Sequence, residues 1–330
     1  MLHKTLAVVT LLFIVVTAPV YAADEAPRRP RRKAKPRADR EALMAKQLAG
    51  ADVHVFKTIG DVKLRLFAFK PEAHKATDKR PAIVFFFGGG WTNGSPTQFA
   101  QHCQYLASRG MVAITAEYRI RSKHGATVPQ CVADAKSAVR WVRENAGKLG
   151  VDPERIAAGG GSAGGHLGGC VGVVPGLDEA SEDQSISSRP NALVLFNPVM
   201  AVAPADGLSQ QYTQSMARRN EQFGGDPKAI SPLHHIQKDQ PPMIMFFGSA
   251  DRLRESSVLF DKAYRAAGNR CELKTWDGPG HGFFNFGREG NKYFIETCRE
   301  MDAFLVSLGY LEGDPTIESF VKELAAPVRR

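Results

Sequence analysis

Beyond residue 50 the chain alternates between short, continuous apolar runs and longer segments in which apolar residues recur with the period of a helix. A short continuous run is typical of a strand buried on both faces, as in a parallel sheet covered by helices. Two earlier segments, 53–59 and 62–69, are joined through Gly60-Asp61 and predict an antiparallel hairpin. The remaining strands are predicted at residues 82–87, 111–116, 155–159, 192–196, 243–247 and 272–276.

Two helices stand out in the pattern. One begins after Thr127, a predicted N-cap, and ends before Gly150, and the other covers residues 294–308. Alternating strands and helices with right-handed crossovers predict an α/β fold, with a mainly parallel sheet, antiparallel N-terminal edge strands and helices on both faces. In such a sheet the functional groups lie at the carboxyl ends of the strands.

The regular pattern of apolar residues is lost between residues 198 and 236, where the sequence is rich in Gln, Ala, Gly and Pro. This segment is too long to be a simple connection within a compact domain. We therefore expect a small lid-like insertion that faces the substrate.

The first 22 residues differ in kind from the rest. Lys4 precedes an apolar run at 6–16, and Val20-Tyr21-Ala22 has the small-residue pattern of a cleavage site. We interpret residues 1–22 as a signal peptide, with an uncleaved membrane anchor as the alternative. The prediction is a secreted or periplasmic protein that has no integral membrane contact after cleavage.

Most of the positive charge lies near the N-terminus. The first 40 residues hold nine Lys or Arg and three Asp or Glu, which is +6 of the total of +9. The basic residues gather after the apolar segment, in a stretch of Arg, Lys, Pro and Ala without apolar periodicity. Residues 23–50 are therefore predicted to be a basic disordered linker before one folded domain at 51–330. The folded part has no basic stripe with interleaved aromatic residues, so no nucleic-acid partner is expected. The oligomeric state stays open.

The chain has five cysteines. They are spread through the predicted elements, so most are expected to be small buried residues. An odd number leaves at least one thiol free, and if one pair is bridged we expect Cys271 with Cys298. No Cys or His spacing indicates a metal site.

The segment Gly160-Gly161-Ser162-Ala163-Gly164 reads G-x-S-x-G and lies where a strand runs into a glycine-rich helix start. A sharp strand-to-helix turn exposes the serine hydroxyl, and it requires very small residues on either side of the serine. In a chain with 31 glycines the motif can also arise by chance. Ser162 is nevertheless the candidate nucleophile, because the rest of the chain supplies its partners.

A nucleophilic serine needs a base and an orienting acid. His281 lies in the loop after the last predicted strand, and Asp251 follows the strand at 243–247. The order Ser, Asp, His is the one found with the G-x-S-x-G turn. Asp277 is the rival acid, although it is only four residues from His281.

Donors for an oxyanion are expected in two places. Gly88-Gly89-Gly90 ends a buried strand, so backbone N–H groups there can approach a ligand closely. The N–H of Ala163 lies at a helix N-terminus, where the dipole favours negative charge.

Together these motifs resemble the α/β-hydrolase fold, in its esterase/lipase branch. The chain is similar over about residues 53–310 to hormone-sensitive-lipase-like and to acetylxylan- or feruloyl-esterase-like members. The family's H-G-G-G loop corresponds to residues 87–90, which implies Gly89, Gly90 and Ala163 as the oxyanion donors. Phe87 replaces the histidine that usually braces this loop, so its rigidity must come from packing. Gly161 stands where lipase-like members often carry an acid, which favours the carbohydrate-esterase-like members.

Other family-like segments are interpreted as structural. Tyr118-Arg119 resembles a recurrent dipeptide and is expected to brace the fold, with Arg119 paired to Asp134. His234 and His235 lie in a segment that leads into the next strand, and we expect them to be structural.

The resemblance implies a serine carboxylic-ester hydrolase that works through an acyl-enzyme on short or aromatic acyl esters. Carbohydrate esters of the acetylxylan or feruloyl type are expected, so the partner is a small-molecule or polysaccharide ester. No cofactor or metal is needed. Trp91 and Phe283 are candidates to line the acyl or sugar pocket, and Phe284 is a candidate either for this pocket or for the core. The alternatives are a peptidase or arylformamidase on the same fold, or a non-catalytic binding module.

Overall fold

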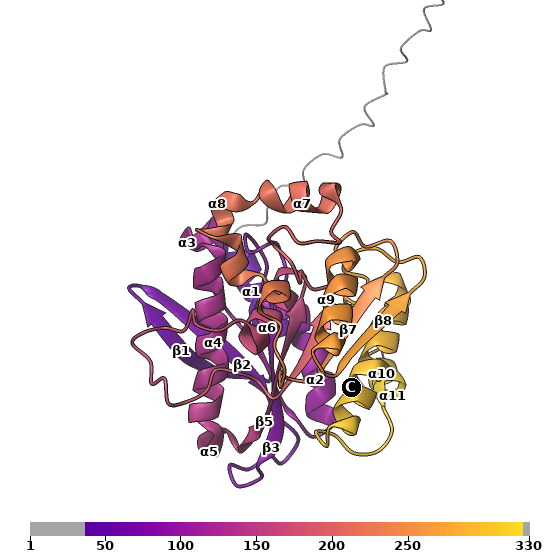
Figure 1. The fold of residues 1–330 in the computed structure, drawn as a ribbon. Coiled ribbons are helices and arrows are strands. Elements are labelled where there is room, and N and C mark those ends of the chain that lie inside the picture. The colour runs from indigo at the N-terminus through magenta and orange to yellow at the C-terminus, as the bar shows by residue number, and fades with distance from the viewer. Residues whose placement is uncertain (1–36, 326–330) are drawn as a thin grey trace, which may run out of the picture.

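The computed structural model describes residues 37–325, which contain one eight-stranded sheet (Figure 1). The strand order is β1-β2-β4-β3-β5-β6-β7-β8. The first two strands are antiparallel, and every pair from β4 to β8 is parallel. The strands are β1 (Asp52–Ile59), β2 (Val62–Phe69), β3 (Arg80–Phe86), β4 (Val112–Ala116), β5 (Val151–Gly161), β6 (Ala192–Phe196), β7 (Met243–Gly248) and β8 (Cys271–Trp276).

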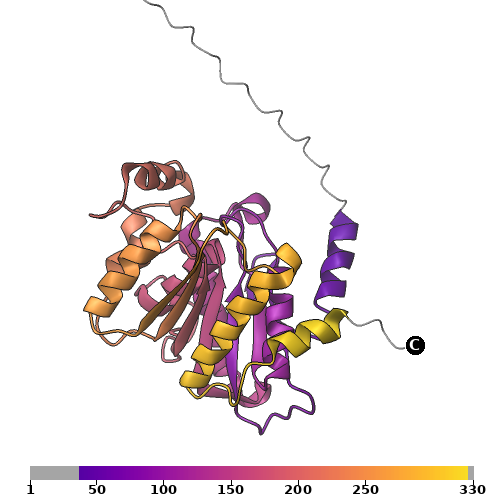
Figure 2. The same cartoon turned by 90° about the vertical axis from the view of Figure 1, so that its right-hand side faces the viewer.

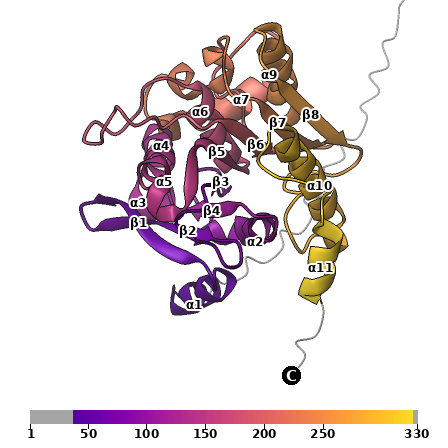
Figure 3. The ribbon, with the colours of Figure 1, turned by 90° about the horizontal axis from the view of Figure 1, so that it is seen from below.

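Helices cover both faces of the sheet (Figures 2 and 3). One layer includes α4, α6 and α9, and the other includes α1, α2, α10 and α11. The α-helices are α1 (Arg37–Gln47), α2 (Ala100–Ser108), α3 (Arg121–His124), α4 (Val128–Glu144), α5 (Ala146–Leu149), α6 (Ala163–Val173), α7 (Gln210–Ala217), α8 (Asn220–Phe223), α9 (Arg254–Ala266), α10 (Lys292–Ser307) and α11 (Ile317–Ala325). Short 3₁₀ helices are η1 (Pro96–Phe99), η2 (Pro227–Ile230), η3 (Pro232–His235) and η4 (Glu289–Asn291).

The central strands are apolar on both faces because each face has its own core. In β3, Val84 and Phe86 pack under the layer of α4 and α6, whereas Ile83 and Phe85 pack under α2 and α10. All four side chains are fully buried. The continuous apolar runs of the sequence therefore correspond to strands covered on both sides, as predicted.

Helix α4 departs from the predicted length. It begins with a capping box in which Thr127 and Gln130 satisfy each other's backbone N–H groups. It ends at Glu144, however, and a separate short helix α5 carries the chain to Gly150. At the break, both the backbone N–H and the side chain of Asn145 donate to the carbonyl of Trp141, at 3.0 and 2.9 Å.

The end of the predicted disordered linker is also ordered. Residues 37–47 form α1, and the chain after it is held by Leu48, which is 5% exposed. Met44 lies one helical turn before Leu48 and packs on the same core. The predicted signal peptide and the first part of the linker lie outside the described residues. No helix within residues 37–325 is long and apolar enough to cross a membrane.

All five cysteines are buried and free. The pairing of Cys271 with Cys298 is therefore wrong, and the expectation of small buried residues is confirmed. Cys298 packs inside the core beneath α10, while Cys271 belongs to the core on the opposite face of the sheet. The sheet itself separates the two thiols.

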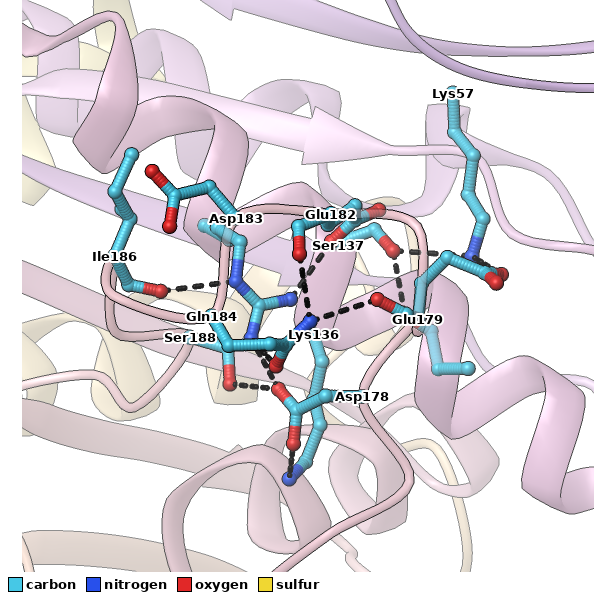
Figure 4. A network of polar contacts seen from close by, with 12 residues as sticks. Lys57, Lys136, Ser137, Asp178, Glu179, Glu182, Asp183, Gln184, Ile186 and Ser188 are labelled. Atoms are coloured by element: carbon cyan, nitrogen blue, oxygen red, sulfur yellow. Dashed lines mark hydrogen bonds and ion pairs between the residues drawn. The ribbon is translucent and has the colours of Figure 1, made fainter.

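A network of ion pairs fixes the segment that follows α6 (Figure 4). Lys136 and Arg140 on α4 both pair with Asp178, and Arg140 also pairs with Glu182 at 2.7 Å. Lys57 from β1, with its side chain 6% exposed, bridges Asp134 and Glu179 at 3.0 Å each. All of these cations have carboxylate partners within the network. The network therefore holds the segment between α6 and β6 against α4.

Candidate active site

Ser162 lies at the turn between β5 and α6. Its backbone has φ 55° and ψ −118°, a strained conformation for a residue with a side chain. A Cβ at Gly160 or at Gly164 would collide with the carbonyl oxygen of Phe86 in the neighbouring strand β3. The glycines of the motif are therefore required by the close approach of β3 to the turn, as predicted.

The structure brings Ser162 together with His281 and Asp251. The Oγ of Ser162 lies 2.9 Å from Nε2 of His281, and Nδ1 of His281 lies 2.8 Å from Oδ2 of Asp251. If Nδ1 carries the proton and donates it to Asp251, Nε2 is free to accept the serine proton. The side chain of Asp251 is 2% exposed and that of His281 is 44% exposed. The acid is thus shielded from water while the base faces the substrate side.

Asp277, the rival acid, is engaged elsewhere. It accepts a hydrogen bond from Ser249 at 3.0 Å. The second oxygen of Asp251 accepts the backbone N–H of Leu253 at 2.9 Å, which fixes the orientation of the carboxylate toward the imidazole. Of the two candidate acids, the structure places only Asp251 against His281.

The loop that carries His281 is held by a residue that the sequence patterns missed. Asn197, directly after β6, is fully buried and accepts the N–H of Gly282 at 3.2 Å. Its φ is 43°, a left-handed conformation that asparagine tolerates better than most residues. The one sequence feature that could have indicated this role is that Asn197 stands at the carboxyl end of a predicted strand.

The glycine loop after β3 has the geometry expected of an oxyanion site. Gly89 and Gly90 have φ values of 125° and 63°, which glycine adopts readily. Within residues 37–325, the N–H groups of these two glycines donate to no other group. Ala163 begins α6, so its N–H has no partner one turn earlier in the helix. Three free backbone donors thus flank Ser162.

Packing and hydrogen bonds hold this loop in place of the missing histidine. The ring of Phe87 stacks on Tyr118 with centroids 4.2 Å apart, and the Tyr118 hydroxyl donates to the Phe87 carbonyl at 2.7 Å. The N–H of Gly88 donates to Gln98, whose amide donates to Asn285 near His281. The prediction that packing supplies the rigidity is confirmed, while Gln98 and Asn285 were not found from the sequence.

The predicted brace around Arg119 is also confirmed. Its guanidinium forms two hydrogen bonds of 2.8 Å with Asp134, which is completely buried. His234 and His235 bond to the backbone carbonyls of Pro204 and Lys228, so both are structural. Within the part of the chain that the structure describes, no group of three or more His, Cys, Asp or Glu is arranged to hold a metal.

A cavity of about 650 Å³ opens around Ser162 and His281. Trp91 and Phe284 line it, as do Val199, Met216 and Arg219 from the predicted insertion. Helices α7 and α8 of that insertion lie together above the sheet, at the top of Figure 1. Phe283, in contrast, does not line the cavity. Its ring packs against Trp276 and Tyr293 and is not among the residues that line the cavity, so its predicted contact with substrate is wrong.

A second hollow of about 900 Å³ lies at the amino ends of the parallel strands, lined among others by Pro153, Asn191 and Pro242. It contains neither a nucleophilic serine paired with a histidine nor a glycine loop. In open parallel sheets the chemistry takes place at the carboxyl ends. The cavity at Ser162 is therefore the candidate active site.

A mainly parallel eight-stranded sheet with a serine on a sharp β5–α6 turn defines the α/β-hydrolase fold. The family model described as BD-FAE matches residues 69–262, and the chain belongs to this family.

Named relatives agree with the family assignment. Carboxylic ester hydrolase LipN of Mycobacterium tuberculosis is 27% identical over 267 residues, which cover 74% of this chain and 68% of LipN. Carboxylesterase NlhH of the same organism is 27% identical over 226 residues, covering 63% of this chain and 68% of NlhH.

Solved structures of esterase 2 from Thermogutta terrifontis are more similar. The apo form is 50% identical with a TM-score of 0.76, and the match covers 81% of this chain and 98% of that one. The same esterase has been solved phosphonylated by sarin, at 49% identity and a TM-score of 0.78 over the same shares of the two chains. The protein is a carboxylic ester hydrolase of the serine-esterase type.

Proposed function

We propose that Ser162, His281 and Asp251 form the catalytic triad of this esterase and that Gly89, Gly90 and Ala163 bind the oxyanion. The observation that carries the proposal is the pair of contacts at 2.9 and 2.8 Å that links Oγ of Ser162 through the imidazole of His281 to the buried Asp251. A serine hydroxyl becomes nucleophilic when an oriented base removes its proton.

The reaction proceeds in two halves. The Ser162 oxygen attacks the ester carbonyl carbon while Nε2 of His281 takes the hydroxyl proton, and the negative charge collects on the carbonyl oxygen. When the tetrahedral intermediate collapses, the C–O bond to the alcohol breaks and His281 returns the proton to the leaving oxygen. Water, deprotonated by His281, then attacks the acyl-enzyme, and the carboxylic acid leaves as Ser162 is reprotonated. Each oxyanion donor contributes about 2.7–4 kcal/mol to transition-state stabilisation.

The acyl group is proposed to be short or aromatic. The Thermogutta esterase has been solved with propionate and with butyrate bound. The cavity of about 650 Å³ here lies within the usual range for small-molecule sites, about 300–1,000 Å³. Carbohydrate esters of the acetylxylan or feruloyl type are the proposed natural substrates, on the motif at residues 160–165 and the absence of an acid at Gly161. A peptidase or arylformamidase activity stays the alternative.

An assay of the purified protein on 4-nitrophenyl esters from acetyl to decanoyl tests the acyl preference. We expect kcat/KM to fall as the chain lengthens. Ser162→Ala should abolish turnover with the circular dichroism spectrum unchanged, while Ser215→Ala, at another serine of the same cavity, should stay active. Long-chain preference would contradict the acyl proposal. Turnover that survives in Ser162→Ala would contradict the triad, and faster cleavage of the matching 4-nitroanilides would favour the peptidase alternative.

Carbohydrate specificity requires its own comparison. Xylo-oligosaccharides with acetyl or feruloyl groups should be hydrolysed with a higher kcat/KM than the corresponding methyl acetate or methyl ferulate. Equal values would leave a general short-chain esterase.

We also propose that the chain is exported, on the pattern of charge and apolar residues in 1–22. Expression of the full chain should give a mature protein that begins after Ala22 outside the cytoplasmic membrane. An intact N-terminus in the cytoplasmic fraction would contradict export.

A further inference from the structure

Three arginines stand among the residues that line the cavity around Ser162. They are Arg219, Arg252 and Arg288, here called the arginine rim, and all three are exposed. Each comes from a different segment: Arg219 follows α7, Arg252 follows Asp251, and Arg288 ends the loop after His281. The one acidic residue of the lining is Asp251, which is already bonded to His281. The lining therefore sets three guanidinium groups against one engaged carboxylate.

Within residues 37–325, the carboxylates close in sequence to the rim, those of Glu221, Glu255 and Glu289, form no ion pair with it. Glu221 pairs with Arg121 at 3.1 Å, and Glu255 bonds to Ser209. Asp277 accepts its hydrogen bond from Ser249. Among the ion pairs within residues 37–325, none involves a member of the arginine rim. The positive charge at this opening is thus available to a ligand.

The rim reaches both sides of the reacting centre. The Nη1 atom of Arg219 lies 3.1 Å from the position that a Cβ on Gly90 would occupy, so it lies beside the oxyanion loop. Nη1 of Arg288 donates to the carbonyl oxygen of His281 at 3.2 Å, so that side chain is anchored beside the base. A guanidinium has five N–H donors, and Arg288 keeps most of its donors for another partner.

Three guanidinium groups around one opening favour the binding of an anion. Like charges around a concave opening repel one another, and an anion between them offsets that repulsion. A cleft lined by one sign of charge concentrates ligands of the opposite sign. The planar fork of arginine matches a carboxylate in a bidentate contact, which a lysine does not reproduce.

We propose that the arginine rim selects esters that carry a free carboxylate apart from the bond that is cleaved. The inference rests on the proposed function and names the substrate class of that same site. The carboxylate belongs either to the acyl portion, as in a monoester of a dicarboxylic acid, or to the alcohol portion, as in an acylated acidic sugar or hydroxy acid.

Two matched pairs of substrates test the rim on the full-length protein. For the acyl portion, monophenyl adipate is compared with the phenyl ester whose distal carboxylate is a primary amide. For the alcohol portion, 4-acetoxybenzoate is compared with 4-acetoxybenzamide. At low ionic strength we expect kcat/KM for the anionic member of at least one pair to exceed that of its neutral partner by about tenfold, and added salt should reduce the ratio. The pair that responds identifies the portion that carries the carboxylate.

Variants then assign the effect to the rim. In the triple variant Arg219→Gln, Arg252→Gln, Arg288→Gln the ratio of anionic to neutral kcat/KM should fall to near one. Arg218→Gln changes the neighbouring exposed arginine, which does not line the cavity, and should keep the wild-type ratio.

The possible failures are distinguishable. If the neutral esters are cleaved by the wild type, are not cleaved by Ser162→Ala, and are as good as the anionic ones, the rim proposal is overturned and the proposed function stands. A ratio that persists in the triple variant also overturns the rim. If the wild type cleaves no ester of either pair, the proposed function fails and the rim proposal fails with it.

Discussion

Tyr118 holds Phe87 in two ways at once: its ring stacks on the phenylalanine ring, and its hydroxyl donates to the Phe87 carbonyl at 2.7 Å. Phe87 is the residue immediately before the glycine loop, so this contact fixes the start of the proposed oxyanion site. Both side chains are nearly fully buried, and the hydrogen bond is shielded from water. In this chain the pair Phe87–Tyr118 braces the start of the glycine loop, at the position where the family motif has a histidine.

Tyr118→Phe should therefore affect catalysis as well as stability. The stack is kept, but the buried carbonyl of Phe87 loses its donor, which costs about 1–3 kcal/mol of unfolding free energy. A small displacement of the oxyanion donors should lower kcat about tenfold, with a smaller change in KM. Steady-state kinetics and urea unfolding measure the two effects.

Tyr264→Phe is the matched control, because Tyr264 is also buried and donates to a backbone carbonyl, that of Pro241, at 2.8 Å. It lies at the amino ends of the strands, so it should lose similar stability and retain kcat. Equal kcat losses in the two variants would mean that the Phe87 carbonyl has no special role.

Asp251→Asn should lower kcat by about 10⁴-fold, because an amide no longer holds the imidazole in the tautomer that accepts the serine proton. Asp277→Asn should leave kcat near the wild-type value, since Asp277 bonds to Ser249. Comparable losses in the two variants would contradict the assignment of Asp251 as the acid.

Gly164→Ala should disrupt the turn at Ser162. Its Cβ would meet backbone atoms of both Phe86 and Phe87, which cannot turn aside as a flexible side chain can. We expect a loss of about 3 kcal/mol or more, together with loss of activity. Gly147→Ala is the control, because nothing lies within 4 Å of a Cβ there, and helix propensity predicts a gain of up to about 1 kcal/mol. Thermal denaturation compares the two, and a tolerated Gly164→Ala would contradict the steric argument.

His102 should make the protein sensitive to acid. It is fully buried among phenylalanine rings, and within the described residues neither ring nitrogen has a hydrogen-bond partner. Burial lowers the pKa of His102 to about 3. Between this value and the ordinary pKa of about 6.5 the unfolded chain binds a proton that the folded chain does not, so stability falls as the pH falls through this window.

His102→Leu tests this dependence with a residue of similar size. From pH 7.5 to pH 5.0 the wild type should lose about 2 kcal/mol more unfolding free energy than the variant. Both proteins keep His166, whose pKa burial lowers to about 4, so the difference isolates His102. Urea unfolding at the two pH values provides the measurement, and parallel losses would show that His102 is protonated without cost in the folded state.

The fold was predictable to the extent that local patterns determine it. The hairpin and the continuous apolar strands follow from period and turn residues, and the structure reproduces them within a few residues. The interruption of α4 at Asn145 and the ordering of α1 were missed. The ordering of α1 depends on a tertiary contact, because Leu48 after it is held by the core beneath α10, whereas the bond of Asn145 to Trp141 is local and the apolar pattern does not register it.

The candidate site was predictable where the chain order and the turn geometry constrain it. The aromatic residues after His281 were not. Phe283 and Phe284 are adjacent, and Gly282 before them has φ 75°, so the sequence gives no rule for which ring faces the cavity. Both rings pack in the same core, and of the two only Phe284 also lines the cavity.

The sequence by itself determined the strands, the start of the helix after Thr127, the turn at Ser162 and the order of Ser162, Asp251 and His281. Each of these depends on neighbours along the chain. The tertiary structure alone decided which acid meets the imidazole, how Gln98 bonds to Asn285 across 187 residues, and that three arginines from separate segments share one opening. These relationships depend on distances between segments remote in sequence, and packing of the two cores against the sheet sets those distances.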